Sequence, residues 1–524
     1  MNNADIATTN NTPSAPVSAL SARYTLLLGL ALGLHADSLL WDYDPTPLTL
    51  LLLLTGFAIG ALILGWYNKS EALQAQALCS IAVLACAMLM VWRTTPIIGA
   101  LMLLCILALL ALFILRRGGL PWRHSEPHHA ITVALTVLVA IVNRNLLLLQ
   151  AVSQDRRSAD TGMRHIVQGI LLAVPLVIVF GQLFVAADAS FARWAAGVDW
   201  LSPSLPFQLL FVLAFGWFAS SLVALAWQPV RFDGERFRFT PGATEVNIAL
   251  AALSILFVVF AGFQLASLFS PAAANVARSG LGIAEYARHG FFQLIWIAAL
   301  ALGVLAAFAS CYRQHWYRRL GALLLSCVVI VLASAVQRMQ YYLQSYGLSV
   351  DRVIASTVML WLALNVVVFA ATVLRQRPGG ILAAAAWQGV ALSMALALAN
   401  PAALVVHANV ARAQQSQQPL DLGYLLSLEA DAVPALIHSF ASLDTADQCR
   451  AAITLIDRWW DTERRRPDNN WRYWQAGHHN AVQAVRTNAN LLQQAAARSG
   501  HPYYRDMTNF SLPQREAAAE AGCR

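Results

Sequence analysis

Four ionisable side chains lie directly before a long apolar segment in the stretch "EYARHGFFQLIWIAALALG", residues 285–303. They are Glu285, Tyr286, Arg288 and His289. An ionisable group at membrane depth is costly, and one without a partner is not expected to persist. Because Glu285 and Arg288 carry opposite charges, we expect them to form an ion pair. Exchanging the two charges should then restore part of what either single reversal loses.

Similar polar and aromatic groups flank other apolar segments. Asp188 follows one of them in "AADASFARWAAGVDW", and "QRMQYYLQSYGLSVDR", residues 337–352, joins two more. Together these stretches predict a ligand- or partner-binding cluster of Asp188, Glu285, Tyr286, Arg288, Arg338, Tyr341, Tyr346, Asp351 and Arg352. The alternative interpretations are structural ion pairing and an interfacial belt, in which tyrosines lie among lipid headgroups and arginines extend toward water.

The composition indicates which elements must position this cluster. Of the 524 residues, 58% are hydrophobic and only 12% are charged. A soluble domain needs a more charged surface, so lipid is the expected solvent for most of this chain. The net charge of +8 derives from arginine, since Lys69 is the only lysine, and the arginines lie mainly between apolar segments. This pattern is typical of membrane proteins and argues against nucleic acid as a partner.

A membrane-spanning helix needs about 20 mostly apolar residues. Eleven stretches meet this requirement: 22–40, 47–66, 75–92, 96–115, 166–186, 206–227, 246–269, 290–310, 320–337, 353–374 and 380–399. A twelfth, within 130–157, is interrupted at Asn143, Arg144 and Asn145, so we expect it to dip into the membrane or lie along its surface. Twelve spans with an external N-terminus are the alternative. The predicted fold class is an all-α polytopic transmembrane helix bundle.

Arginines in the short loops predict the orientation, because cytoplasmic loops carry excess positive charge. From residue 144 onward, alternate loops hold twelve arginines in one set and five in the other. Assigning the richer set to the cytoplasm places the N-terminus inside and the polar tail outside. The predicted cluster then lies on the external face.

Three regions follow from the composition: a disordered leader at 1–20, the helix bundle at 21–400, and a helical extracytoplasmic C-terminal region at 401–524. Apolar residues recur at helical spacing in the last region, which predicts three or four short helices. Cys449 and Cys523 also lie there and could form a disulfide if the tail is oxidised. The other five cysteines lie in or beside apolar segments and form no CxxC pair.

Motifs for catalysis and metal binding are absent from the sequence. It contains no GxxxxGK[ST], HExxH or GxSxG, and "HSEPHH" at 124–129 matches no tight metal-ligand spacing. We therefore predict no metal, no cofactor and no enzymatic activity. The rival hypothesis is a membrane enzyme like the polytopic glycosyltransferases that use lipid-linked substrates, with Asp37 or Asp42 as the catalytic carboxylate. The short loop at 41–47 leaves no room for the usual external helices of those enzymes.

Several motifs occur in a characteristic order. They are "ADASFA", "YARHGFFQLIWIAALALG", "RMQYYLQSYGLSVDRVIA", "NPAALVVHANVARAQQ", "LDLGYLLSLEADAVPAL" and "NNWRYWQAGHHNAV". In this order they resemble a bacterial polytopic membrane family catalogued only as a domain of unknown function, over roughly residues 165–485. Ala189 stands where a proline is usual. The resemblance implies a multi-pass bacterial membrane protein with a short soluble tail, and it implies no particular reaction or ligand.

These observations predict a non-enzymatic protein of the bacterial inner membrane with a transport-like or sensing role. Besides the lipid bilayer, the expected partner of the external cluster is a small solute, a lipid headgroup or an envelope protein. An envelope assembly or scaffold protein is a further possibility.

Overall fold

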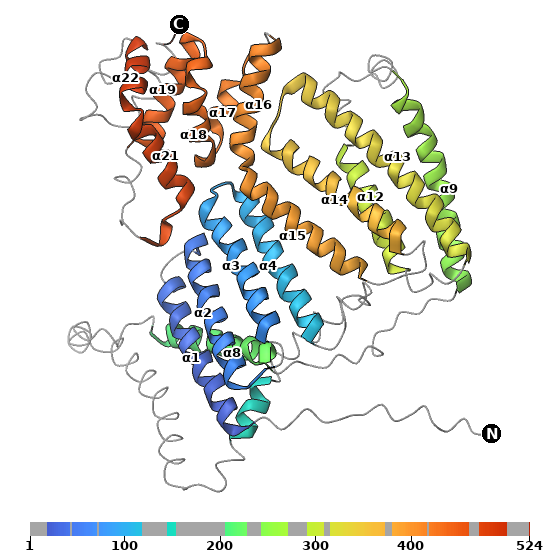
Figure 1. Ribbon diagram of the computed structural model, residues 1–524, viewed down its shortest axis with the longest axis vertical. Coiled ribbons are helices and arrows are strands. Elements are labelled where there is room, and N and C mark those ends of the chain that lie inside the picture. The colour runs from blue at the N-terminus through green and yellow to red at the C-terminus, as the bar shows by residue number, and fades with distance from the viewer. Residues whose placement is uncertain are drawn as a thin grey trace, which may run out of the picture. The chain divides into compact units, whose positions relative to one another are not determined.

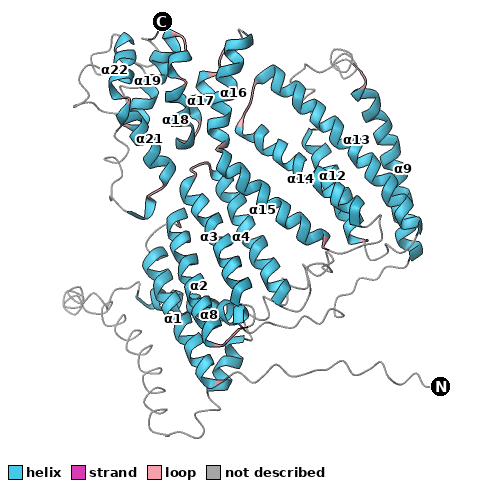
Figure 2. Cartoon of the chain, viewed as in Figure 1, coloured by secondary structure: helices cyan, strands magenta, loops and turns pink. Residues whose placement is uncertain are grey.

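The computed structural model describes residues 18–41, 45–70, 73–117, 144–152, 205–227, 243–270, 291–308, 315–372, 380–416, 419–460, 471–499 and 523. Within these ranges the regular structure is entirely helical, as Figures 1 and 2 show. This confirms the predicted all-α fold class. The predicted leader and several loops lie outside the described residues.

Nine helices in the described part of the chain are long and apolar enough to cross a membrane. They are α1 (Ala19–Leu40), α2 (Pro47–Tyr67), α3 (Leu73–Trp92), α4 (Pro96–Arg117), α8 (Leu205–Trp227), α9 (Ala243–Leu268), α13 (His315–Tyr346), α14 (Val350–Thr372) and α15 (Ile381–Ala399). Each overlaps a predicted span. The predicted span 290–310 corresponds to the shorter apolar helix α12 (Phe291–Ala307), and the one at 166–186 lies outside the described residues.

Helix α13 corrects the interpretation of residues 337–352 as a connecting loop. It runs for 32 residues and continues to Tyr346, so only residues 347–349 separate it from α14. Hydropathy marks where a helix leaves the apolar solvent, but a helix satisfies its own backbone hydrogen bonds and can continue into water. Arg338, Tyr341 and Tyr346 therefore lie on the last turns of a long helix.

The chain forms two compact units. The first consists of Met1–Pro45, Leu52–Leu78 and Ala134–Arg231, and the second of Thr46–Leu51, Cys79–Val133 and Phe232–Arg524. In the first unit α1 packs closely against α8. A Cβ added to Gly29 would lie 2.5 Å from Ser220 Cβ and 2.7 Å from the carbonyl oxygen of Gly216, so the two backbones approach each other where side chains are small.

Residues 144–152, within the interrupted stretch 130–157, are helical and belong to the same unit. Asn145, one of the polar residues that interrupt the apolar stretch, is fully buried. Its Nδ2 donates to the carbonyl oxygen of Trp217 (2.6 Å), and its Oδ1 accepts from the hydroxyl of Ser220 (2.9 Å). The amide therefore joins this segment to α8. Whether 130–157 crosses the membrane stays a prediction, because the rest of it lies outside the described residues.

In the second unit, α13 packs against α9, α12 and α14, and α15 packs against α14 and α4 (Figure 1). Buried apolar residues from these helices, including Leu250, Leu324 and Phe369, form one core. The hydroxyl of Ser334 donates to Gln264 Oε1 at 2.6 Å and adds a buried bond between α13 and α9. A separate cluster that includes Phe291, Met339 and Ala355 packs the C-terminal part of α13 against the starts of α12 and α14.

The tail consists of α16 (Pro401–Ser416), α17 (Leu422–Ser427), α18 (Val433–His438), α19 (Thr445–Trp459), α21 (Ala476–Thr487) and α22 (Ala489–Ala496), with short 3₁₀ turns between some of them. Their apolar faces share a buried core that includes Val405, Phe440 and Ile453. Val350, the first residue of α14, belongs to the same core. The tail is therefore packed onto the start of a membrane-spanning helix.

The carboxylate of Asp431 joins the tail to the loop between α3 and α4. Asp431 is 5% exposed, and its Oδ2 accepts from the backbone N–H groups of Thr94 (2.7 Å) and Thr95 (3.2 Å) and from the Thr95 hydroxyl (3.2 Å). These N–H groups lie at the N-terminal end of α4, where the helix dipole favours negative charge. Burial lowers the pKa of the Arg93 guanidinium, while the charge of Asp431 opposes that shift. We call residues 93–95 and Asp431 the Asp431 junction.

Residues of the Asp431 junction also form hydrogen bonds with the connection between α15 and α16. Asn400 separates these helices in a left-handed conformation (φ 53°), and its Nδ2 donates to the carbonyl oxygen of Asp431 (3.0 Å). Arg93 donates to two carbonyl oxygens in the last turn of α15, at 2.6 and 3.0 Å. A Cβ at Gly477 would lie 2.6 Å from Asp431 Oδ1, which explains a glycine at that position.

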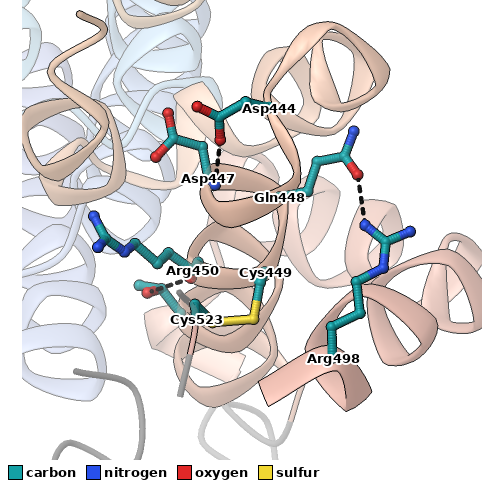
Figure 3. Close-up of a disulfide and its surroundings, with 8 residues drawn as sticks. Asp444, Asp447, Gln448, Cys449, Arg450, Arg498 and Cys523 are labelled. Carbon is teal, nitrogen blue, oxygen red and sulfur yellow. Dashed lines mark hydrogen bonds between the residues drawn. A yellow bond between two sulfur atoms is a disulfide. The ribbon is translucent and has the colours of Figure 1, made fainter. Parts of the chain in front are cut away.

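Cys449 and Cys523 form a disulfide, with their Cα atoms 5.8 Å apart (Figure 3). Cys449 lies on α19, five residues after the N-cap Asp444, whose carboxylate accepts from the N–H of Asp447 at 2.7 Å. Arg498, just after α22, donates to Gln448 Oε1 of the same helix α19 at 3.1 Å. The sequence raised this disulfide as a possibility, and the structure contains it.

Candidate functional site

A cavity of about 630 Å³ lies between the C-terminal end of α13, the start of α14, and the tail helices α16 and α17. We call it the α13–α14 cavity. Its charged lining residues are Asp351, Arg352, Arg412 and Asp421. Its aromatic lining residues are Phe291, Phe292, Tyr342, Tyr346 and Tyr424. All of these residues belong to the second unit.

Two guanidinium groups bind the C-terminal end of α13. Arg352 Nη1 donates to the carbonyl oxygens of Tyr346 (3.2 Å) and Gly347. Arg412 Nη2 donates to those of Gln344 (2.7 Å) and Ser345 (3.3 Å). The last carbonyls of a helix have no partner within the helix and carry its negative dipole end. The arginines therefore satisfy and neutralise this helix end from α14 and α16.

The turn after α13 requires glycine. Gly347 has a φ of 73°, in the left-handed region, and its N–H donates to the carbonyl oxygen of Leu343 (2.9 Å). A Cβ here would overlap Asn409 Oδ1 and lie 2.8 Å from Arg412 Nη1. Both the backbone conformation and the available space thus exclude a larger side chain.

Two tail side chains bind the main chain of this turn. Asn409 Oδ1 accepts from the N–H of Leu348 (2.8 Å), and its Nδ2 donates to the carbonyl oxygen of the same residue (2.7 Å). The Tyr424 hydroxyl accepts from the N–H of Val350 (3.0 Å). The tail therefore fixes the conformation of the α13–α14 connection and forms one wall of the cavity.

Arg352 also stacks on aromatic rings. Its Cζ lies 4.0 Å from the ring centroid of Tyr342 and 6.0 Å from that of Tyr346, and the two rings meet at 5.4 Å with an interplanar angle of 61°. Stacking holds the guanidinium plane in place through cation–π attraction. Of its nitrogens, Nη1 makes the side-chain hydrogen bonds found among the described residues. Nη2 and Nε therefore remain as donors for a ligand.

Both acidic residues of the cavity lie at helix N-termini. Asp421 caps α17, and its Oδ1 accepts from the N–H of Tyr424 (3.0 Å). Asp351 is exposed in the first turn of α14. In the lining, the two arginines therefore bind the C-terminal end of one helix, and the two aspartates lie at the N-termini of two others. Helix dipoles favour this arrangement of charges.

The structure brings together part of the predicted cluster. Tyr346, Asp351 and Arg352 line the cavity, whereas Arg338 and Tyr341 lie on α13 outside its lining. Asp188, Glu285, Tyr286 and Arg288 lie outside the described residues. Phe291 and Phe292, which come shortly after Arg288 in the sequence, line the cavity.

Sequence reasoning missed Tyr342 and the whole contribution of the tail. Asn409, Arg412, Asp421 and Tyr424 had been assigned no role. All four lie in the stretches "NPAALVVHANVARAQQ" and "LDLGYLLSLEADAVPAL", which carried the family resemblance. That position within the motifs was the available signal.

The other candidate chemistry has a structural explanation where it is described. In the first unit, Gln208 Nε2 donates to Asp37 Oδ2 at 2.8 Å, and His35 Nε2 lies 3.2 Å from the carbonyl oxygen of Leu52. Asp42 and residues 124–129 lie outside the described part of the chain. Among the residues that are described, no three or more His, Cys, Asp or Glu side chains are grouped to hold a metal ion.

Comparison with known proteins identifies the family. No curated protein and no solved structure matches the chain. Residues 78–439 match a family model described as a domain of unknown function, DUF4153. The match covers more than half of the chain, contains every lining residue of the cavity, and confirms the resemblance to a family of this kind. The chain, with the helices of a multi-pass membrane protein, therefore belongs to the DUF4153 family.

Proposed function

We propose that this protein is a non-enzymatic, multi-pass protein of the bacterial cytoplasmic membrane that recognises a ligand in the α13–α14 cavity, in a transport-like or sensing role. The observation that carries the proposal is the cavity itself. Its volume of about 630 Å³ lies in the range of small-molecule sites, which are typically about 300–1,000 Å³. Such sites combine an apolar wall with a few fixed polar groups, and Phe291, Arg352 and Tyr424 are groups of these two kinds.

The proposed orientation has the N-terminus in the cytoplasm and the tail, from 401 onward, outside. The distribution of arginines supports it. The disulfide between Cys449 and Cys523 supports it as well, because disulfides persist in oxidising compartments and are rare in the cytosol. The cavity then faces the external side.

The rival functions have less support. Asp37, the described candidate for a catalytic carboxylate, accepts a hydrogen bond from Gln208, which supports a role in joining α1 to α8. The third candidate function is a scaffold whose tail docks another envelope protein. The tail core of this chain instead includes Val350 of α14, which supports a role within the chain itself.

Cysteine labelling in intact cells tests the orientation. Gln415→Cys on α16 and Lys69→Cys after α2 introduce thiols at exposed positions on opposite predicted sides. We expect a membrane-impermeant maleimide to modify Gln415→Cys in intact cells and Lys69→Cys only after the membrane is opened. The parent protein gives the background from the native cysteines. Labelling of Lys69→Cys alone in intact cells would contradict the external tail.

Protection of a thiol inside the cavity tests ligand recognition. Ser345 lines the cavity with an exposed side chain, and Gln415 is exposed on α16 but outside the lining. We expect Ser345→Cys to be alkylated several-fold more slowly in native membranes than in ligand-stripped protein in detergent. Gln415→Cys should show no such difference, and adding Arg352→Gln should abolish the protection. Equal rates for Ser345→Cys in both preparations would contradict the proposed function.

A further inference from the structure

We propose that the ligand of the α13–α14 cavity carries a zwitterionic phosphoethanolamine group, and that its source is a phospholipid of the surrounding membrane. This inference rests on the proposed function, since it names the ligand class for the same site. It follows from the charges of the lining, from its apolar wall, and from its place at the ends of membrane-spanning helices.

The basic side of the lining fits a phosphate. A guanidinium offers paired N–H donors in a planar fork that matches phosphate oxygens. Arg352 is held in one orientation by the Tyr342 ring and by the carbonyl oxygens of the turn, and its Nη2 and Nε are not used in those bonds. Arg412 adds a second positive charge to the same lining. A phosphate bound here could accept from Nη2 and Nε of Arg352.

The acidic side of the lining fits a primary ammonium. Asp351 and Asp421 line the same cavity, and Asp421 caps α17 through Oδ1. A ligand with a phosphate alone would place its negative charge near two carboxylates. A ligand with both a phosphate and an ammonium group matches the two arginines and the two aspartates together. A quaternary ammonium has no N–H to donate, so the primary amine is the better match.

The apolar wall indicates that the ligand is an amphiphile. Phe291 and Phe292 begin α12, Met339 lies near the end of α13, and Ala355 lies near the start of α14. Phe292 is 58% exposed on an apolar helix, so the wall continues onto a surface that faces lipid. A site at the ends of spanning helices lies at headgroup depth, where a phospholipid can insert its head while its acyl chains stay in the bilayer.

Native mass spectrometry of the full chain, released from detergent, tests the inference. The probes are phosphatidylethanolamine, phosphatidylcholine and phosphatidylglycerol at equal concentration, and soluble glycerophosphoethanolamine. We expect one phosphatidylethanolamine to be retained at least about tenfold more tightly than either other lipid, as expected from charge-assisted hydrogen bonds. Arg352→Gln should weaken retention of all three lipids toward the nonspecific level.

Two variants separate recognition from folding and from general charge. Asp421→Asn retains a side-chain oxygen that can cap α17, so it should fold normally and lose only the preference for the primary amine over phosphatidylcholine. Arg319→Gln removes an exposed arginine at the opposite end of α13, where Arg319 lies over Trp316, and should leave retention unchanged.

The outcomes distinguish this inference from the proposed function. Binding of glycerophosphoethanolamine but not of the lipid, lost in Arg352→Gln, would support the headgroup chemistry and assign it to a soluble solute. Equal retention of all three lipids, unchanged in Asp421→Asn, would overturn the inference while leaving a recognition site if Arg352→Gln still weakened it. Retention that no cavity variant alters, together with no thiol protection in native membranes, would overturn both.

Discussion

Asp431→Ala is expected to lower the free energy of unfolding by about 3–5 kcal/mol, the range for removing one partner of a buried charged network. The substitution removes the acceptor of three hydrogen bonds, from the N–H groups of Thr94 and Thr95 and from the Thr95 hydroxyl. It also removes the negative charge that favours the charged form of Arg93 and so opposes the lowering of its pKa by burial. Because the site is almost fully buried, water cannot replace the carboxylate without opening the junction.

Thermal unfolding of the purified protein in detergent, followed together with limited proteolysis of the tail, measures this effect. Glu429→Ala is the matched control, since Glu429 lies two residues earlier and forms a surface ion pair with Arg458 (3.7 Å). Its loss should cost at most about 1 kcal/mol. Asp431→Asn, which keeps an acceptor oxygen but not the charge, should fall between the two. Equal melting temperatures for the Asp431→Ala and Glu429→Ala variants would show that the junction contributes little.

Gly29→Ala is expected to destabilise the first unit, although alanine usually stabilises a helix interior relative to glycine by about 0.5–1 kcal/mol. The added Cβ would lie 2.5 Å from Ser220 Cβ and 2.7 Å from the carbonyl oxygen of Gly216. One of these atoms is a backbone oxygen of α8 and the other is a Cβ bonded directly to its backbone, so neither can rotate away. Separating the two helices should cost about 1–3 kcal/mol, as overpacking does in other cores.

Gly262→Ala and Gly303→Ala are the controls for this second prediction. Both glycines lie inside apolar helices, and a Cβ at either position would meet no atom of the described residues within 4 Å. Their melting temperatures should equal or slightly exceed that of the parent, whereas that of Gly29→Ala should fall. A Gly29→Ala variant as stable as Gly262→Ala would mean that α1 and α8 are not packed as closely as described.

The membrane helices could be predicted from the sequence because the bilayer sets a simple requirement of length and apolar composition. Their limits could be predicted only where the helix ends with the apolar segment. Helix α13 continues to Tyr346, beyond the predicted limit at 337, since its backbone needs no apolar solvent to remain helical. Asn145 shows the opposite limitation: a polar residue that interrupts an apolar stretch is buried against Trp217 and Ser220.

Only those residues of the candidate site that are close together in the sequence could be predicted. Tyr346, Asp351 and Arg352 are close in the sequence, and the apolar segments on both sides placed them at one helix end. Asn409 and Tyr424 bind the same turn through tertiary contacts, which a single sequence does not reveal. Arg352 also binds main-chain carbonyls and stacks on Tyr342, contacts that the sequence does not reveal.

The turn at Gly347 has a consequence for how the chain can evolve. Position 347 must be occupied by a residue without a side chain, and Asn409 occupies the space that a side chain would need. A substitution at 347 is therefore tolerable only in a background where 409 has already become smaller and the turn has changed its conformation. Losing Asn409 first would release the main chain of Leu348. We expect each single step to be unfavourable, so substitutions at 347 and 409 should be energetically coupled.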